Sequence, residues 1–182
     1  SGDKLKILTI EQWGTNTWAT TEGAFAGCSN LTSNAIDVPD LSLVTNTSSM
    51  FAGASSFNQD LDLLDVSSVG DMHSMFLNAT AFNGDIGSWD VGAVYDMTNM
   101  FSGASSFNKN INSWNVSSVE DMGLMFENAS SFNQDLNSWD VSLVVNMGDM
   151  FSGASAFNGN ISLWNTVSVT NMSNMFSGAS AF

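Results

Sequence analysis

Carboxylates that recur every 25 residues are the side chains of this 182-residue sequence with the most evident capacity for chemistry. One column begins with Asp60 and Asp85, and another begins with Asp65 and Asp90. Stacking of identical units would bring like charges about 5 Å apart, and Ca²⁺ takes carboxylate and amide oxygens as ligands. These residues are therefore a candidate metal site for Ca²⁺. Hydrogen bonding within the fold is the favoured alternative, because no EF-hand motif is present. No other cofactor is expected.

Two further columns are candidates for binding a ligand. The aromatic column holds Trp89, Trp114 and Trp139, whose rings could stack on a sugar or anchor a peptide. Pro39 and Leu64 occupy the same column in earlier units, which favours burial of the rings instead. The second column changes from unit to unit, as an exposed binding surface would, and it consists of Asp62, Gly87, Asn112, Asn137 and Ser162.

No set of residues in the sequence is suited to catalysis. The one histidine, His73, lies two residues after Asp71 and outside the apolar stripe described below, so we interpret it as a solvated side chain on a helix surface. A nucleophile and base cannot be assembled around it. The paired carboxylates come from repetition of a unit and not from a single cleft. We therefore expect no enzyme activity.

A repeat of 25 residues positions all of these side chains. Its clearest marker is a column of phenylalanines: Phe51, Phe76, Phe101, Phe126, Phe151 and Phe176. Around each of them an apolar stripe has i, i+3, i+4, i+7 spacing, as in Met97, Met100, Phe101 and Ala104, and this spacing predicts a short helix.

Residues at both ends of the stripe support this interpretation. Asp71 and its counterparts directly precede the stripe. Their side chains can accept hydrogen bonds from the free backbone amides of a first helical turn, as a helix N-cap does. Asn78 and Gly103 follow the stripe in their units, and these residue types favour the positive φ that ends a helix.

Residues 86–91 and their copies hold the remaining large apolar side chains between polar neighbours, which predicts one short strand in each unit. The expected fold is an α/β repeat solenoid with one strand and one helix per 25-residue turn and a parallel strand ladder. We expect a single domain over residues 1–182, with an irregular N-terminal capping region at 1–38 and regular repeats at 39–182, the last of them incomplete.

Charge and composition exclude several classes of protein. The chain has 3 basic and 18 acidic residues, a net charge of −15, so nucleic acid and anionic lipid would be repelled. No apolar run approaches the roughly 20 residues that cross a bilayer, so no membrane insertion is expected. The single Cys28 excludes an intramolecular disulfide and a cysteine-rich zinc site.

Three motifs carry a resemblance to a known family. They are Met-Phe-x-x-Ala at 75–79, Phe-Asn-x-Asp-Ile at 82–86 and Trp-Asp-Val-Ser-x-Val at 139–144. With these motifs the chain resembles the BspA-like leucine-rich-repeat surface proteins, in the subgroup with a 25-residue Met-Phe/Trp-Asp unit. The resemblance implies a right-handed leucine-rich-repeat-like coil.

The same resemblance implies an extracellular or cell-surface protein that takes part in adhesion. We expect a non-enzymatic module, part of a longer bacterial-type adhesin, that binds a protein or peptide on another cell or matrix through its repeat face. A glycan ligand is a further candidate. The alternative is a spacer, stiffened by Ca²⁺, that projects a neighbouring domain.

The last unit stops at Phe182, before the residues that would complete it. A stack of repeats cut at this point leaves its final apolar stripe uncovered. We therefore expect that the chain is part of a longer array and that this end self-associates or frays.

Overall fold

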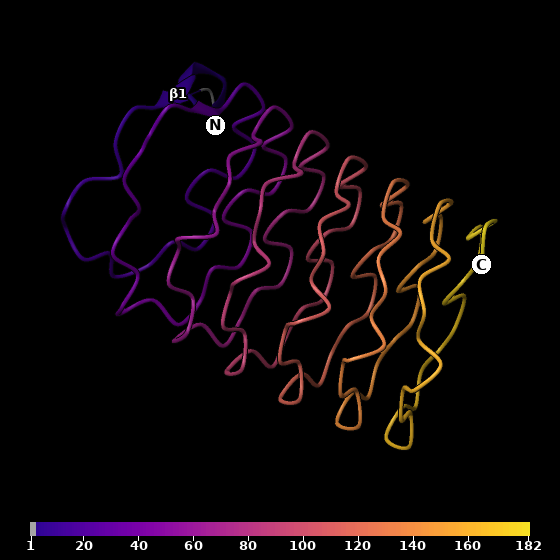
Figure 1. Ribbon diagram of the computed structural model, residues 1–182. Helices are drawn as coiled ribbons and strands as arrows, with labels where there is room; N and C mark the ends of the chain where they lie inside the picture. Colours follow the sequence, from indigo (N-terminus) through magenta and orange to yellow (C-terminus); the bar gives the residue numbers. More distant parts are fainter. Residues whose placement is uncertain (1–2) are drawn as a thin grey trace.

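The computed structural model describes residues 3–182 and shows a chain that winds in successive coils, each stacked on the one before (Figure 1). The first and last coils lie at opposite ends of the stack. Among the described residues, regular elements occur only near the start: a 3-10 helix η1 at Lys4–Lys6 and two strands, β1 at Thr9–Ile10 and β2 at Thr32–Ser33. The strands are parallel, with Thr9 opposite Thr32 and Ile10 opposite Ser33. Within residues 3–182 no helix is long and apolar enough to span a membrane.

The apolar stripe of each unit forms a series of turns, so the predicted helix is wrong. In a helix the amide of Phe101 would donate to the carbonyl of Met97. It donates instead to the carbonyl of Met125 in the next coil, at 2.9 Å, whereas the neighbouring amide of Met100 closes a turn on Met97 at 3.1 Å. Asn99, with a φ of 57°, reverses the chain inside the stripe. Amides therefore alternate between a turn within the coil and a bond to the next coil.

The residues predicted to end the stripe have the expected backbone conformation, but the segment between them is a series of turns and not a helix. Asn78 and Gly103 have φ values of 55° and 70°, as expected. Oδ1 of Asp71 accepts from the backbone amide of His73 at 3.0 Å, the local bond that Asp and Asn side chains make in turns.

The predicted strand at residues 86–91 is also wrong. Gly87 and Ser88 form a turn, and the amide of Trp89 bonds back to the carbonyl of Ile86 at 3.3 Å. Parallel pairing between coils occurs as isolated bridges at the column expected to cap helices: Asn46, Asp71, Asp96, Asp121, Asn146 and Asn171. The expected α/β solenoid of leucine-rich-repeat type, with a helix and a strand in every unit and a parallel strand ladder, is therefore not what this sequence forms.

Stacked aromatic rings fill the space enclosed by the coils. Phe76 and Phe101 are fully buried, with ring centroids 5.6 Å apart. A second phenylalanine column lies against the first, and Phe107 stacks on Phe101 with centroids 4.1 Å apart. Each such side chain contributes about 1.5–3 kcal/mol by leaving water. The buried apolar residues form one continuous cluster from Ile10 to Met175.

The final coil is covered on one side only. Phe182 stacks on Phe176 with centroids 4.2 Å apart, yet Phe182 is 53% exposed and Met172 is 45% exposed. Their counterparts Phe157 and Met147, which lie one coil earlier, are fully buried.

The backbones of neighbouring coils lie in close contact at Gly84. A Cβ atom on Gly84 would collide with the carbonyl oxygen of Gln59 in the preceding coil. Gly84→Ala should therefore lower the free energy of unfolding by about 1–3 kcal/mol, measured by denaturant titration. At Gly92 an added Cβ would lie 3.2 Å from Oδ1 of Asp90, an exposed side-chain atom that can move, so Gly92→Ala is the matched control. Equal, small effects of both substitutions would contradict this packing.

Candidate functional site

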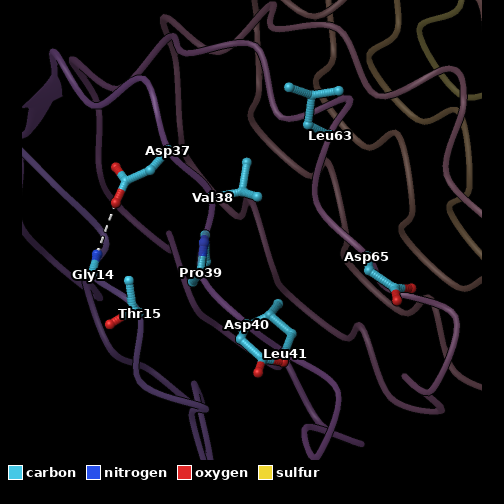
Figure 2. A pocket seen from close by; sticks show the side chains of 9 residues that line it. All are labelled: Gly14, Thr15, Asp37, Val38, Pro39, Asp40, Leu41, Leu63 and Asp65. Atoms are coloured by element: carbon cyan, nitrogen blue, oxygen red, sulfur yellow. Dashed lines mark hydrogen bonds between the residues drawn. The ribbon is translucent and has the colours of Figure 1, made fainter.

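A hollow of about 540 Å³ lies beside the first coils, where the repeat is least regular. Its lining combines apolar and acidic side chains (Figure 2). We call it the acidic groove and define it by Asp37, Val38, Pro39, Asp40, Leu63 and Asp65. The lining comes from consecutive coils, because Val38 and Leu63, and likewise Asp40 and Asp65, occupy equivalent positions of the repeat.

Backbone amides hold Asp37 at one side of the groove. Its carboxylate accepts from the amides of Trp13, at 3.0 Å, and Gly14, at 2.9 Å. Gly14 has a φ of 84°, a conformation that favours glycine. The hydrogen bond from Trp13, followed by that from Gly14, lowers the pKa of Asp37 because both bonds favour the ionised carboxylate.

Hydroxyl and amide donors hold the other two carboxylates. Asp40 accepts from Oγ1 of Thr17 at 2.7 Å and from the amide of Ser42 at 3.0 Å. Its hydrogen bonds with the side chain of Ser42 and then with Thr17 lower the pKa of Asp40. The pKa of Asp65 is lowered chiefly by the hydroxyl of Ser67, which donates to Oδ1 at 2.7 Å.

The two stacked carboxylates of the groove act on each other. The charge of Asp40 acts to raise the pKa of Asp65. The hydrogen bonds from Ser67 outweigh that charge, so the net shift is downward. Between residues 3 and 182, ion pairs are formed by Asp3, Asp71 and Asp85, and none involves a carboxylate of the groove.

The apolar part of the groove is a local departure from the repeat. Leu63 is 79% exposed and Val38 is 40% exposed. The equivalent positions in the next three coils hold Ser88, Ser113 and Ser138, and an exposed leucine returns only at Leu163. Sequence reasoning missed the groove, and the signal that could have found it is this replacement of serine by an apolar side chain in two consecutive units.

The predicted aromatic ligand contacts lie in the core. Trp89, Trp114 and Trp139 are 4%, 2% and 3% exposed. The indole nitrogen of Trp114 donates to the carbonyl oxygen of Ile86 in the preceding coil at 3.0 Å. These rings cannot meet a ligand at the surface, and the alternative interpretation, burial, is confirmed.

The predicted variable column lies on the outer turns, but its side chains bind neighbouring coils. Asp62 accepts from the amide of Ser88, and Asn112 accepts from the amide of Ser138, both at 3.0 Å. Asn137 accepts in the same way from Leu163 at 2.8 Å. The other members are Gly87, which is half-buried, and Ser162, which is exposed. This surface therefore already has a structural role.

The predicted calcium ligands are likewise engaged in the fold. Asp60 accepts from the amide of Asp85 at 2.9 Å, and Asp85 pairs with Lys109 at 2.7 Å. Asp65 binds Ser67, and Asp90 accepts from the amide of Gly92 at 3.0 Å. These four carboxylates are not gathered into a group of three potential ligands in the part of the chain that the structure describes. The alternative interpretation, hydrogen bonding within the fold, accounts for them.

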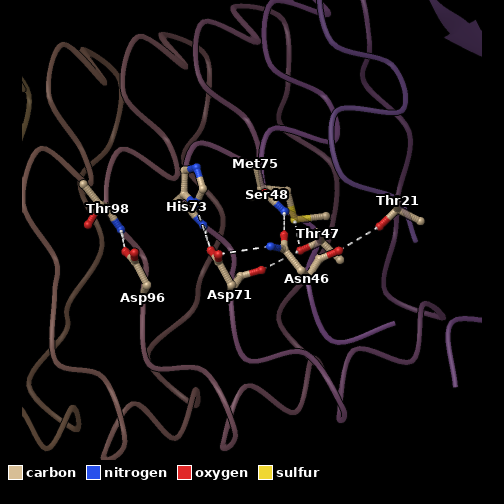
Figure 3. A network of polar contacts seen from close by, with 9 residues as sticks. All are labelled: Thr21, Asn46, Thr47, Ser48, Asp71, His73, Met75, Asp96 and Thr98. Carbon is tan, nitrogen blue, oxygen red and sulfur yellow. Dashed lines mark hydrogen bonds and ion pairs between the residues drawn. The ribbon is translucent and has the colours of Figure 1, made fainter. Parts of the chain in front are cut away.

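The one such group among residues 3–182 consists of Asp71, His73 and Asp96 (Figure 3). Nδ1 of His73 lies 2.9 Å from Oδ1 of Asp71, and the backbones of Asp71 and Asp96 form a parallel bridge. The sequence predicts His73 to be a solvated side chain on a helix surface, whereas the structure places it on a turn beside Asp71. The 25-residue step from Asp71 to Asp96 is the signal that could have placed two carboxylates beside it.

The lowered pKa values give a signed prediction for stability. A carboxyl group with a lowered pKa stabilises the folded state above its unfolded pKa of about 4, and the contribution is lost as the pH falls through the folded pKa. Asp65→Asn should therefore lower the thermal midpoint at pH 7, and the difference from the parent chain should shrink as the pH falls below about 4. In a Ser67→Ala background the same substitution should have a smaller effect at pH 7. A difference that grows with acidification would contradict this origin.

Comparisons with known proteins place the chain in a family. Residues 3–106 and residues 83–182 each match the family described as "Mycoplasma protein of unknown function, DUF285". A search of curated proteins and a search of solved structures each found no match. The two matched segments overlap and together cover residues 3–182, which supports a repeat family without supporting the BspA-like proteins specifically. The chain therefore belongs to the DUF285 family.

Proposed function

We propose that this protein is a non-enzymatic recognition module that binds an extended, cationic segment of another protein in the acidic groove. The observation that carries the proposal is the composition of the groove, in which three carboxylates lie beside exposed apolar side chains and have no basic partner within residues 3–182. Asp37, Asp40 and Asp65 supply the charge, and Val38 and Leu63 supply the apolar surface.

Charge complementarity favours a basic partner. The chain has a net charge of −15, which attracts a cationic segment and raises its rate of association. Asp37, Asp40 and Asp65 have lowered pKa values, so the groove keeps its charge in mildly acidic conditions. A volume of about 540 Å³ accommodates a few side chains of a peptide.

The motif resemblance to BspA-like surface proteins supports an extracellular or cell-surface setting for this module. The partner would then be a protein or peptide on another cell or matrix, and the module would serve adhesion. A glycan is the less favoured ligand, because the aromatic rings that could stack on sugars, such as Trp114, are buried in the core.

A structural spacer is the alternative function, and the regularity of the stack favours it. Bonds between neighbouring coils recur at equivalent positions, for example from Phe76 to Met100 and from Phe101 to Met125, both at 2.9 Å. A spacer would require no exposed apolar residues at Val38 and Leu63, so the two functions differ in what they predict for the groove.

The repeat supplies substitutions that test the groove with residues that equivalent positions already hold. Asn115 and Asn165 occupy the positions equivalent to Asp40 and Asp65, and Ser88 occupies the position equivalent to Leu63. Asp40→Asn combined with Asp65→Asn removes charge, and Leu63→Ser removes apolar surface. Asp140→Asn is the matched control, because Asp140 belongs to the same column but lies outside the groove.

The binding measurement uses isothermal titration with a twelve-residue peptide of alternating lysine and valine. The double Asp→Asn variant should bind roughly tenfold more weakly, and Leu63→Ser should also weaken binding, because opposite charges and buried apolar surface both contribute. Asp140→Asn should bind like the parent chain. Equal losses in the groove variants and the control, or no binding by the parent chain, would refute the proposal and favour the spacer.

A further inference from the structure

We propose that Asp71, His73 and Asp96 form a binding site for a divalent transition-metal cation, with Zn²⁺ as the preferred ion. The site lies on a different part of the coils from the acidic groove and does not depend on the proposed function. It also differs from the predicted calcium columns, which contain none of these three residues.

Geometry is the first support for the site. One nitrogen of His73 and one oxygen of each Asp lie within 4.8 Å of one another. Ligand atoms on one tetrahedral zinc are separated by about 3.3 Å, and Nδ1 of His73 is already 2.9 Å from Oδ1 of Asp71. The side chain of His73 is 43% exposed, so a cation can enter from solvent.

Electrostatics is the second, independent support. Asp71, Asp96 and Asp121 are the consecutive carboxylates of the bridge column, whose remaining members are asparagines. The amide group of Asn46 donates to Asp71 at 3.2 Å, and that of Asn146 donates to Asp121 at 3.0 Å. The two flanking carboxylates are thereby compensated by neighbouring amides.

The central carboxylate lacks this compensation. Within the described chain, the carboxylate of Asp96 accepts from the backbone amide of Thr98 at 2.8 Å and from no neighbouring asparagine. Lys6 and Lys109 pair with Asp3 and Asp85, away from this column. Apart from the imidazole of His73 beside Asp71, no basic side chain within residues 3–182 pairs with these three stacked carboxylates. Their charges therefore repel one another, and a bound cation would offset that repulsion.

The types of donor select the metal. An imidazole nitrogen with two carboxylate oxygens suits zinc, which takes nitrogen and oxygen ligands and can complete its shell with water. Calcium instead requires six to eight oxygen ligands. The amide of Asn46 would orient Asp71 from behind as a hydrogen-bond donor, as outer partners do in zinc sites.

Counterparts in other coils again provide conservative variants. Ser48 and Ser173 occupy the position of His73, and Asn46 and Asn146 occupy the positions of Asp71 and Asp96. His73→Ser and Asp96→Asn therefore remove ligands while introducing residues that the fold already accepts. Asp121→Asn is the matched control, because it removes the same charge from the same column one coil beyond the site.

Isothermal titration of the chelator-treated chain with zinc sulfate tests the proposal. We expect one Zn²⁺ per chain, at least tenfold weaker binding in His73→Ser and in Asp96→Asn, and affinity like that of the parent chain in Asp121→Asn. Unfolding curves of each variant in chelator check that it folds. Absence of zinc binding, equal losses in Asp121→Asn, or calcium binding as tight as zinc binding would overturn the proposal.

A second measurement needs no variant. His73 is the one histidine of the sequence, so the imidazole nitrogen resonances in a ¹⁵N-labelled chain report on this residue alone. Addition of one equivalent of Zn²⁺ should shift one of these resonances into the range of a metal-bound nitrogen. Unchanged imidazole resonances in a chain that binds zinc would place the metal elsewhere and refute the site.

Discussion

The structure depends on the hydrogen bond between one coil and the next. Every second backbone amide of the apolar stripe donates to a carbonyl oxygen of the next coil. The amide of Phe101 donates to Met125 at 2.9 Å, and that of Gly103 donates to Glu127 at 2.7 Å. The intervening amides close turns within their own coil, so the polar backbone is satisfied without a helix. Because this bond fixes the separation of the coils, equivalent side chains must stack on one another. Stacked phenylalanines and tryptophans in the core follow directly from it.

The same constraint determines where binding surfaces can arise. Most exposed polar columns bind the neighbouring coil, as Asn83 does by accepting from the amide of Asn108 at 2.9 Å. A surface free for a partner therefore arises where a unit departs from the repeat. Leu63 in place of serine opens the apolar side of the acidic groove, and His73 in place of serine, threonine or glycine adds an imidazole beside two carboxylates. Both proposals rest on such departures.

The repeat period, the aromatic core and the positive φ at Asn78 and Gly103 could be predicted from the sequence, because each repeats with the unit. The helix could not be excluded, since a series of turns also directs residues at i, i+3, i+4 and i+7 inward. The deciding feature is the positive φ at Asn99 and Leu124, and such a conformation is uncommon for residues other than glycine. The groove and the cluster of Asp71, His73 and Asp96 require knowledge of which units lie side by side, and repetition obscures the single residues that differ.

Alternate backbone amides of the apolar stripe donate hydrogen bonds to the next coil and not along a helix. Scalar coupling across hydrogen bonds in a ¹⁵N,¹³C-labelled chain measures this directly, because it identifies the carbonyl that each amide contacts. The structure predicts a coupling between the amide nitrogen of Phe101 and the carbonyl carbon of Met125. A coupling from Phe101 to the carbonyl of Met97, the helical partner, would contradict it.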